Sequence, residues 1–114
     1  KKIIENFSYV GVLTVEYFIT ETDELLVNEL APRFHNSGHL TIEAFNISQF
    51  ENHVRAVCNL KSNPVEKISN AEMYNVLGFE IQEYKKRIFK KNEFFYDYLK
   101  KNQEKVEKWV ILQF

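Results

Sequence analysis

The sequence predicts an α+β fold, in which an antiparallel β-hairpin is followed by a polar loop, a helix and a smaller mixed segment. Two patterns carry this prediction. Residues 9–30 contain two runs rich in β-branched and aromatic residues, separated by the polar stretch TETDE. Residues 48–60 have apolar residues at helical spacing. Ten Phe and six Tyr in a 45% hydrophobic composition supply enough apolar surface for a core.

Before the loop, three elements are expected in order. Residues 1–8 place Ile3, Ile4 and Phe7 at helical spacing, as in the last turns of a helix. Strands are then predicted from Tyr9 to Ile19 and from Leu25 to Leu30. Residues 31–40 form a loop that is broken by proline and glycine and rich in polar side chains, and a loop of this kind commonly carries function.

A helix is predicted from Ser48 to Leu60, because Ser48 and Glu51 form an S-x-x-E capping box. Phe50, Val54, Val57 and Cys58 share one face of this helix, so the single cysteine is expected to be a buried structural thiol. The remaining elements are a connector over 61–70, a short apolar segment at 73–77, a helix at 80–91, and strands at 94–98 and 109–112.

Composition excludes several classes of partner. Fifteen basic and sixteen acidic residues leave a net charge of −1, so the chain presents no overall field for nucleic acid or anionic lipid. It has no apolar run of about 18 residues, as a membrane helix requires, and no charged-then-apolar leader. We therefore expect a cytoplasmic protein without nucleic-acid or membrane partners. Because Lys1 lies inside a predicted helix, we expect the chain to begin at a cut.

The hairpin brings two carboxylates together. If its loop has four residues, 21–24, antiparallel pairing places Phe18 opposite Val27 and Glu16 opposite Glu29. Like charges that face each other across a sheet are destabilising, and a divalent cation such as Mg²⁺ between them would explain the pair. A five-residue loop or a bulge would instead move one glutamate to the other face, and the hairpin alone leaves both readings open.

The loop after Glu29 adds groups suited to an anionic substrate. Arg33 offers a planar fork for carboxylate or phosphate, and His35 and His39 can donate protons. Asn36 and Ser37 add neutral donors. We expect the Arg33 guanidinium to point into the same cleft as the two glutamates.

These residues make the family recognisable. The segment N-E-L-A-P-R-F-H-N-S-G-H, followed by T-I-E-A and S-Q-F-E-x-H, resembles the end of the ATP-grasp domain in carboxyaminoimidazole ribonucleotide synthetases. The resemblance spans about half the chain, residues 9–60. It implies the C-terminal portion of an ATP-grasp domain, an antiparallel sheet with helices, over residues 1–63 and a small mixed C-terminal subdomain over 64–114.

The resemblance also implies roles for individual residues. Glu16 and Glu29 would hold Mg²⁺, with Mn²⁺ as an alternative, and Asn28 and Glu29 would line the phosphates of ATP. Arg33 and His35 match catalytic positions, with Arg33 at the bicarbonate site. The substrate-binding set that the resemblance implies is Arg33, His35, Asn36, Ser37, Lys100 and Lys108. The implied reaction uses ATP and bicarbonate to carboxylate aminoimidazole ribonucleotide in purine biosynthesis, and the implied assembly is a homodimer.

Two departures from the family accompany this resemblance. Phe34 stands where the family usually has proline or a small aliphatic residue, and the tail motifs Y-G-K and R-K-M-G-H correspond here to Tyr98-Leu99-Lys100 and to residues 107–111. The family's adenine hinge and phosphate lysines are absent, so the remainder of an ATP-grasp enzyme is an expected partner and the chain alone is expected to be inactive. Another ATP-grasp ligase and a degenerate, non-catalytic structural module stay open as alternatives.

Overall fold

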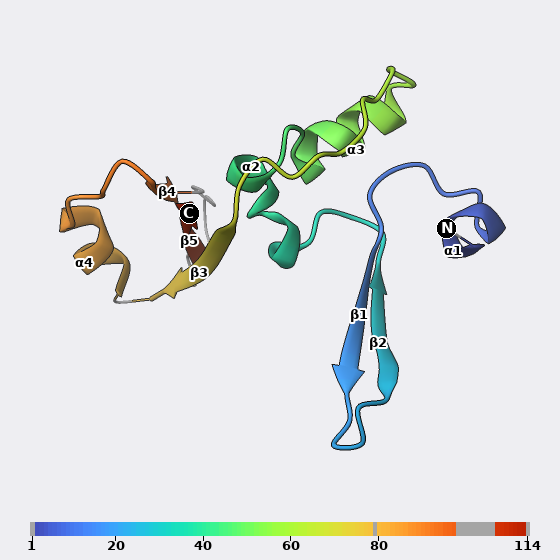
Figure 1. The fold of residues 1–114 in the computed structure, drawn as a ribbon, viewed down its shortest axis with the longest axis horizontal. Helices are drawn as coiled ribbons and strands as arrows, with labels where there is room; N and C mark the ends of the chain where they lie inside the picture. The colour runs from blue at the N-terminus through green and yellow to red at the C-terminus, as the bar shows by residue number, and fades with distance from the viewer. Residues whose placement is uncertain (1, 79, 98–106, 114) are drawn as a thin grey trace.

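The computed structural model describes residues 2–78, 80–97 and 107–113, and its mixture of helices and antiparallel strands confirms the α+β class (Figure 1). The described residues form two sheets, β1-β2 and β3-β5-β4. The helices are α1 Lys2–Asn6, the 3₁₀ turn η1 Asn36–Gly38, α2 Thr41–Ala44, α3 Gln49–Val57 and α4 Glu80–Lys86. The strands are β1 Thr14–Ile19, β2 Leu25–Ala31, β3 Ala71–Leu77, β4 Glu93–Asp97 and β5 Glu107–Gln113.

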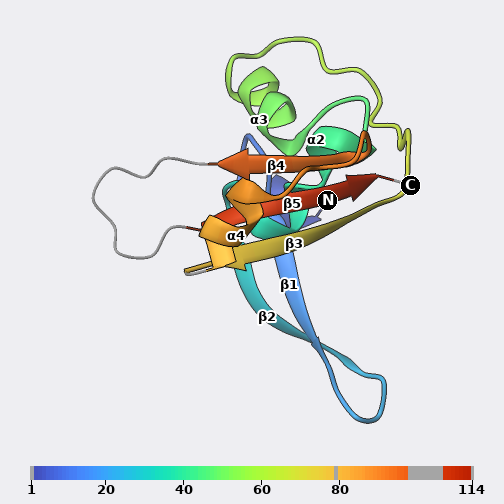
Figure 2. The same ribbon diagram turned by 90° about the vertical axis from the view of Figure 1, so that its left-hand side faces the viewer.

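The elements form an open arrangement. In Figure 1 the β1-β2 hairpin extends away from α2 and α3, while the three-stranded sheet and α4 lie on the other side of α2. Figure 2 shows β5 lying between β3 and β4. The radius of gyration is 16.5 Å, compared with about 13 Å for a compact domain of this length. The apolar face of the hairpin is accordingly exposed, with Tyr17, Ile19 and Val27 at 52%, 71% and 60%.

A small core lies where α4 packs against β3. Val76 and Ile81 are buried there, and Tyr84, Phe89 and Phe95 pack around them. Helix α4 ends at Lys86, so the helix predicted to continue to residue 91 is too long. The chain turns after α4 so that the Phe89 ring stacks on Phe95, with ring centroids 5.5 Å apart. The short apolar segment at 73–77 is the main part of β3.

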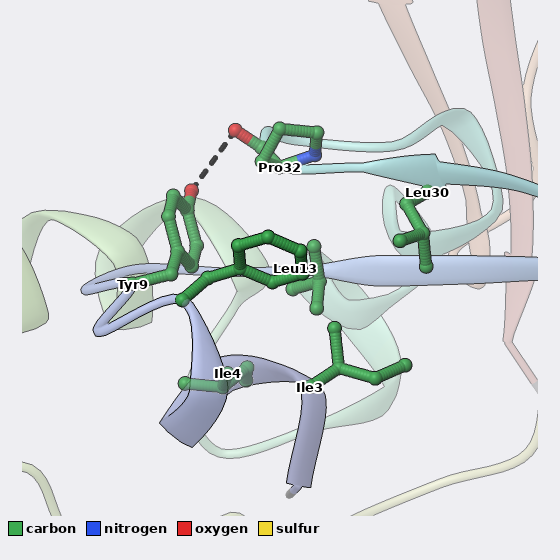
Figure 3. Close-up of a pocket in the computed structure, with 7 residues that line it drawn as sticks. Ile3, Ile4, Tyr9, Leu13, Leu30 and Pro32 are labelled. Carbon is green, nitrogen blue, oxygen red and sulfur yellow. Dashed lines mark hydrogen bonds between the residues drawn. The ribbon is translucent and has the colours of Figure 1, made fainter.

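The predicted strand from Tyr9 is wrong over its first five residues, because β1 begins at Thr14. Residues 9–13 instead form an irregular segment in which Gly11 has a φ of +133°. The Tyr9 hydroxyl lies 2.9 Å from the carbonyl oxygen of Pro32 and 3.1 Å from that of Val12 (Figure 3). The backbone N–H of Val12 donates to Nδ1 of His53 at 3.1 Å, which ties the segment to α3.

Helix α3 begins as predicted, since the Ser48 side chain accepts a hydrogen bond from the backbone N–H of Glu51. The Glu51 carboxylate pairs with Arg55. Cys58 is exposed, so its prediction as a buried thiol is wrong. The buried side of α3 is the one that carries Gln49, and Cys58 lies on a different face. Val54 and Val57, which share that face with Cys58, are 50% and 53% exposed.

The side-chain amide of Asn46 joins α2 to the connector that leads to β3. Its Nδ2 donates to the carbonyl oxygen of Pro64 at 3.0 Å, and its Oδ1 accepts from the backbone N–H of Glu66 at 2.9 Å. An isolated bridge between Phe45 and Lys67 continues this contact. No helix in the described part of the chain has the length and apolar character needed to cross a membrane.

Replacing Gly11 by alanine tests the packing between the irregular segment and α3. A Cβ at Gly11 would lie 2.7 Å from the His53 ring and 2.9 Å from the Tyr9 hydroxyl oxygen. We expect Gly11→Ala to lower the free energy of unfolding by about 2 kcal/mol or more, because backbone strain adds to overpacking. Chemical denaturation measures this loss.

The matched control is Gly78→Ala, since Gly78 also has a positive φ, +54°, but a Cβ there meets no atom within 4 Å. We expect the control to cost about 1 kcal/mol, from backbone conformation alone. Equal losses in the two variants would contradict the close packing of Gly11 against His53 and Tyr9.

Candidate metal and anion site

The two glutamates of the hairpin face each other as predicted, because Glu16 of β1 pairs with Glu29 of β2. The route to this register differs from the predicted one. The last ladder pair is Ile19 with Leu25, which leaves five residues in the connection, and Phe18 pairs with Leu26 where Val27 was expected. A five-residue loop alone would have placed Glu29 opposite Val15, on the other face of the hairpin.

A bulge restores the pairing of the glutamates. Tyr17 pairs with Val27 and Glu16 with Glu29, so Asn28 is the extra residue of β2. The bulge shifts the register by one residue, which returns the Glu29 side chain to the face of Glu16. Both deviations that could have separated the carboxylates are therefore present, and each cancels the effect of the other.

A cluster of three side chains results from this register. Glu16, Glu29 and His35 each offer one ligand atom, and these atoms lie within 4.8 Å of one another. Two carboxylates form an oxygen donor set that suits Mg²⁺ or Mn²⁺. The donors present therefore fit a divalent cation.

Glu16 is the better satisfied of the two carboxylates. Its Oε2 accepts from Nδ2 of Asn28 at 3.2 Å, and its Oε1 is in close contact with Nε2 of His35. The backbone N–H of Ser37 donates to Nδ1 of His35 at 3.3 Å, so a neutral His35 carries its proton on Nε2 and donates it to Glu16. His35 is thus a hydrogen-bonding neighbour of Glu16.

Glu29 is exposed, and within residues 2–78, 80–97 and 107–113 no donor or cation pairs with its carboxylate. Its nearest charged neighbour across the hairpin is Glu16, which has the same sign. Glu16 has hydrogen-bonding partners and Glu29 has none in the described residues. The repulsion between the two carboxylates therefore destabilises this end of the hairpin.

The loop residues Asn36 and Ser37 lie directly beside His35. The Ser37 hydroxyl is 2.7 Å from Nδ1 of His35, and η1 begins with His35 as its N-cap. Oδ1 of Asn36 is buried without a hydrogen-bond partner among the described residues. An unsatisfied buried acceptor costs about 1–3 kcal/mol, and such an atom is suited to a ligand donor.

Arg33 is exposed, and its Nη1 donates to the carbonyl oxygen of Phe34 at 3.0 Å. This contact does not test whether the guanidinium faces the glutamates, which stays a prediction. Phe34, the departure from the family pattern, packs on α3, with ring centroids 4.8 Å from those of both Phe50 and His53. The aromatic ring thereby holds the start of the loop against the helix.

The two lysines predicted to bind substrate are not located at this site by the structure. Lys100 lies outside the described residues. Lys108 belongs to β5, where its backbone pairs with Val76 and Asp97, and its side chain lies outside the description. Both assignments stay predictions.

Three residues near the site were not singled out from the sequence. Gln49 and His53, which are one turn apart in S-Q-F-E-x-H, contact the loop and the irregular segment, and Tyr9 contacts Pro32. The i, i+4 spacing of Gln49 and His53 on one helix face was the available signal.

The buried His39 contacts Gln49 as well. Burial lowers the pKa of His39, and a hydrogen bond with the backbone of His35 opposes this shift.

Comparison with known protein families, sequences and solved structures identifies relatives of this chain. Residues 1–50 match the ATP-grasp domain family. The N5-carboxyaminoimidazole ribonucleotide synthase of Bacillus subtilis is 49% identical over 81 residues, which cover 71% of this chain and 21% of the relative. The N5-carboxyaminoimidazole synthetase of Staphylococcus aureus superposes with a TM-score of 0.79 at 34% identity, over 99% of this chain and 32% of that one.

A synthase from Aspergillus clavatus, solved in complex with ADP and 5-aminoimidazole ribonucleotide, superposes with a TM-score of 0.75 at 31% identity. That match covers 90% of this chain and 30% of the solved one. The hairpin and its loop are therefore an ATP-grasp segment. More narrowly, the chain is homologous to part of the N5-carboxyaminoimidazole ribonucleotide synthases, which confirms the resemblance drawn from the sequence. It spans between about a fifth and a third of the length of these relatives.

The unequal satisfaction of the two carboxylates makes a testable prediction. In this chain, we expect Glu29→Gln to leave the free energy of unfolding unchanged or to raise it by up to about 1 kcal/mol, because a like-charge contact disappears. We expect Glu16→Gln, the matched variant, to lower stability because it weakens the contact with His35. Thermal melts of both variants measure the difference. Marked destabilisation by Glu29→Gln would mean that Glu29 has a stabilising partner.

Proposed function

We propose that this chain supplies the metal- and anion-binding half of an ATP-dependent carbon-nitrogen ligase site. The reaction consumes ATP and bicarbonate, carboxylates the amine of aminoimidazole ribonucleotide, and releases ADP and phosphate, as a step of purine biosynthesis. The observation that carries the proposal is the bulge that aligns Glu16 and Glu29 beside His35, within a chain homologous to synthases of this kind.

The residues divide into two groups around the paired carboxylates. Glu16 and Glu29 would hold Mg²⁺, or Mn²⁺, which supplies charge neutralisation at the phosphates of ATP when bound. Asn28 lies in the bulge and donates to Glu16, which supports its assignment to the same phosphates. A cation between these carboxylates would relieve their repulsion, which supports a metal role over a structural one.

The second group lies in the loop. Arg33 presents a fork of donors suited to the planar bicarbonate anion. His35 and Ser37 are hydrogen-bonded to each other, and Asn36 holds a buried acceptor without a partner in the described structure, so these three are suited to donors and acceptors of the ribonucleotide. Lys100 and Lys108 are proposed as further substrate contacts on the basis of the resemblance alone.

The remainder of an ATP-grasp enzyme is the partner that this proposal requires. We assign residues 1–63 to the end of the ATP-grasp domain and residues 64–114 to a small C-terminal subdomain. The exposed apolar face of the hairpin, with Tyr17, Ile19 and Val27, supports an arrangement in which further chain covers it. A homodimer is part of the proposal by resemblance only.

A chimeric enzyme tests the function. Residues 1–114 would replace the aligned segment of the Staphylococcus aureus synthetase, which covers 99% of this chain. We expect phosphate release that depends on ATP, bicarbonate and aminoimidazole ribonucleotide, and we expect Glu29→Gln to remove it because a metal ligand is lost. The Glu21→Gln chimera is the control, since Glu21 carries an equal charge in the hairpin loop. A folded chimera without turnover, or full activity after Glu29→Gln, would contradict the proposal.

Arg33→Lys in the same chimera tests the anion site separately. We expect a large loss of turnover with little change in the melting temperature, because lysine keeps the charge but not the planar two-donor fork. Steady-state kinetics with varied bicarbonate measure the loss. Arg55→Lys, at an exposed ion pair of α3, is the matched control and is expected to retain activity. Unchanged activity of Arg33→Lys would remove Arg33 from the site.

A further inference from the structure

The side chain of Gln49 connects α3 to the loop that carries His35. Gln49 is the first residue of α3 and is only 8% exposed. Its Oε1 accepts from the backbone N–H of His35 at 3.0 Å, and its Nε2 donates to the carbonyl oxygen of the same residue at 2.8 Å. Because a backbone N–H can only donate and a carbonyl can only accept, these two bonds also determine the orientation of the amide.

The second proton of the Gln49 amide points to another histidine. Nε2 of Gln49 lies 2.6 Å from Nδ1 of His39, which is 7% exposed. An amide nitrogen only donates, so Nδ1 of His39 accepts and its ring is neutral. Burial favours this neutral state because it lowers the pKa of His39. The Gln49 amide thus makes three hydrogen bonds to the loop: Oε1 accepts one, and Nε2 donates two.

The loop sequence leaves room for this side chain. A Cβ at Gly38 would lie 2.4 Å from Oε1 of Gln49 and 2.7 Å from its Cδ. Thr41 completes the fit, since its Oγ1 accepts from the backbone N–H of Gln49 at 2.9 Å and donates to the carbonyl oxygen of Gly38 at 2.5 Å. The glycine is therefore needed to let the Gln49 amide reach the backbone of His35.

We propose that Gln49 is a positioning residue of the metal and anion site, which acts by clamping the backbone of His35 and so directing its ring at Glu16. The clamp holds both sides of the His35 Cα, and Ser37 orients the ring from the other end. Nε2 of His35 then meets Oε1 of Glu16, the carboxylate that faces Glu29. The catalytic part of this proposal rests on the proposed function, and its structural part does not.

The experiment compares two amide side chains that make the same kind of contact in different places. Gln49→Met removes the clamp on His35 while keeping a side chain of similar length. The matched control is Asn46→Leu, which removes the amide that bridges Pro64 and Glu66, away from the site. Because the chain has three histidines, ¹⁵N-histidine labelling of the 114-residue chain gives three resolvable ring signals at one fixed pH.

We expect wild-type His35 to show the ring ¹⁵N shifts of a single tautomer with the proton on Nε2. In Gln49→Met we expect averaged shifts for His35 and a loss of exchange protection at its backbone N–H, with His53 unchanged. Asn46→Leu is expected to leave His35 as in the wild type. Unchanged His35 signals in Gln49→Met would overturn the proposal. A change in the His53 shifts as large as that of His35 would also overturn it, because Gln49 would then have a general structural role.

A second variant and an activity measurement complete the test. Gln49→Glu keeps the acceptor for the N–H of His35 but lacks the donor for its carbonyl, so we expect intermediate His35 signals. In the chimeric synthetase we expect Gln49→Met to lower kcat about 10- to 100-fold, the usual loss when a residue that orients a metal ligand is replaced. We expect Asn46→Leu to change kcat less than about twofold. Equal kcat losses in the two would overturn the positioning role. If the unsubstituted chimera is inactive, the proposed function fails, while the histidine signals still decide the clamp.

Discussion

The β-bulge at Asn28 is the constraint on which the whole site depends. In a hairpin with a two-residue side-chain period, a one-residue change of register moves every following side chain to the opposite face. The five-residue connection makes one such change, and the bulge makes a second. Only their combination puts Glu29 on the face of Glu16, where the loop that follows β2 can deliver His35 to the same carboxylate. Asn28 itself donates a hydrogen bond to Glu16, so the bulge supplies a partner for that carboxylate as well as the register.

Helix α3 holds the loop after β2 through side-chain contacts. Phe34 packs between Phe50 and His53, and the Gln49 amide holds His35. His53 reaches further, because its Nδ1 accepts from Val12 in the segment that leads into β1. One face of a nine-residue helix therefore fixes both the entry to the hairpin and the exit from it. This explains why S-Q-F-E-x-H, which contains no proposed ligand, accompanies the hairpin that carries Glu16 and Glu29.

Sequence patterns predicted the hairpin and the capped helix, because alternation and capping are local signals. The facing of Glu16 and Glu29 was predicted with a four-residue loop, whereas the structure reaches it through a five-residue connection and a bulge. The patterns did not predict the bulge, although an asparagine inside a strand is unusual and was its only local sign. The irregular segment at 9–13 was also missed, since its β-branched composition resembles a strand while Gly11 and the contact of Tyr9 with Pro32 depend on tertiary packing. Cys58 was misplaced for a similar reason: apolar spacing marks a helix face but does not say what covers it.

Several groups around this site are left uncovered in the described structure. The apolar face of the hairpin is exposed, the radius of gyration is that of an open arrangement, and Glu29 has no partner in the described structure. A cavity of about 340 Å³ between α1 and the base of the hairpin, lined by Ile3, Ile4, Leu13 and Leu30 among others, adds further uncovered apolar surface (Figure 3). The polar cluster is nevertheless organised in detail, through the bulge, the Gln49 amide and the Ser37 contacts. In a site of the proposed kind, polar groups that are organised before a ligand arrives lower the cost of ordering them on binding. The chain therefore keeps its chemical groups in place by local hydrogen bonds, while the surfaces around them are of a kind that further protein would bury.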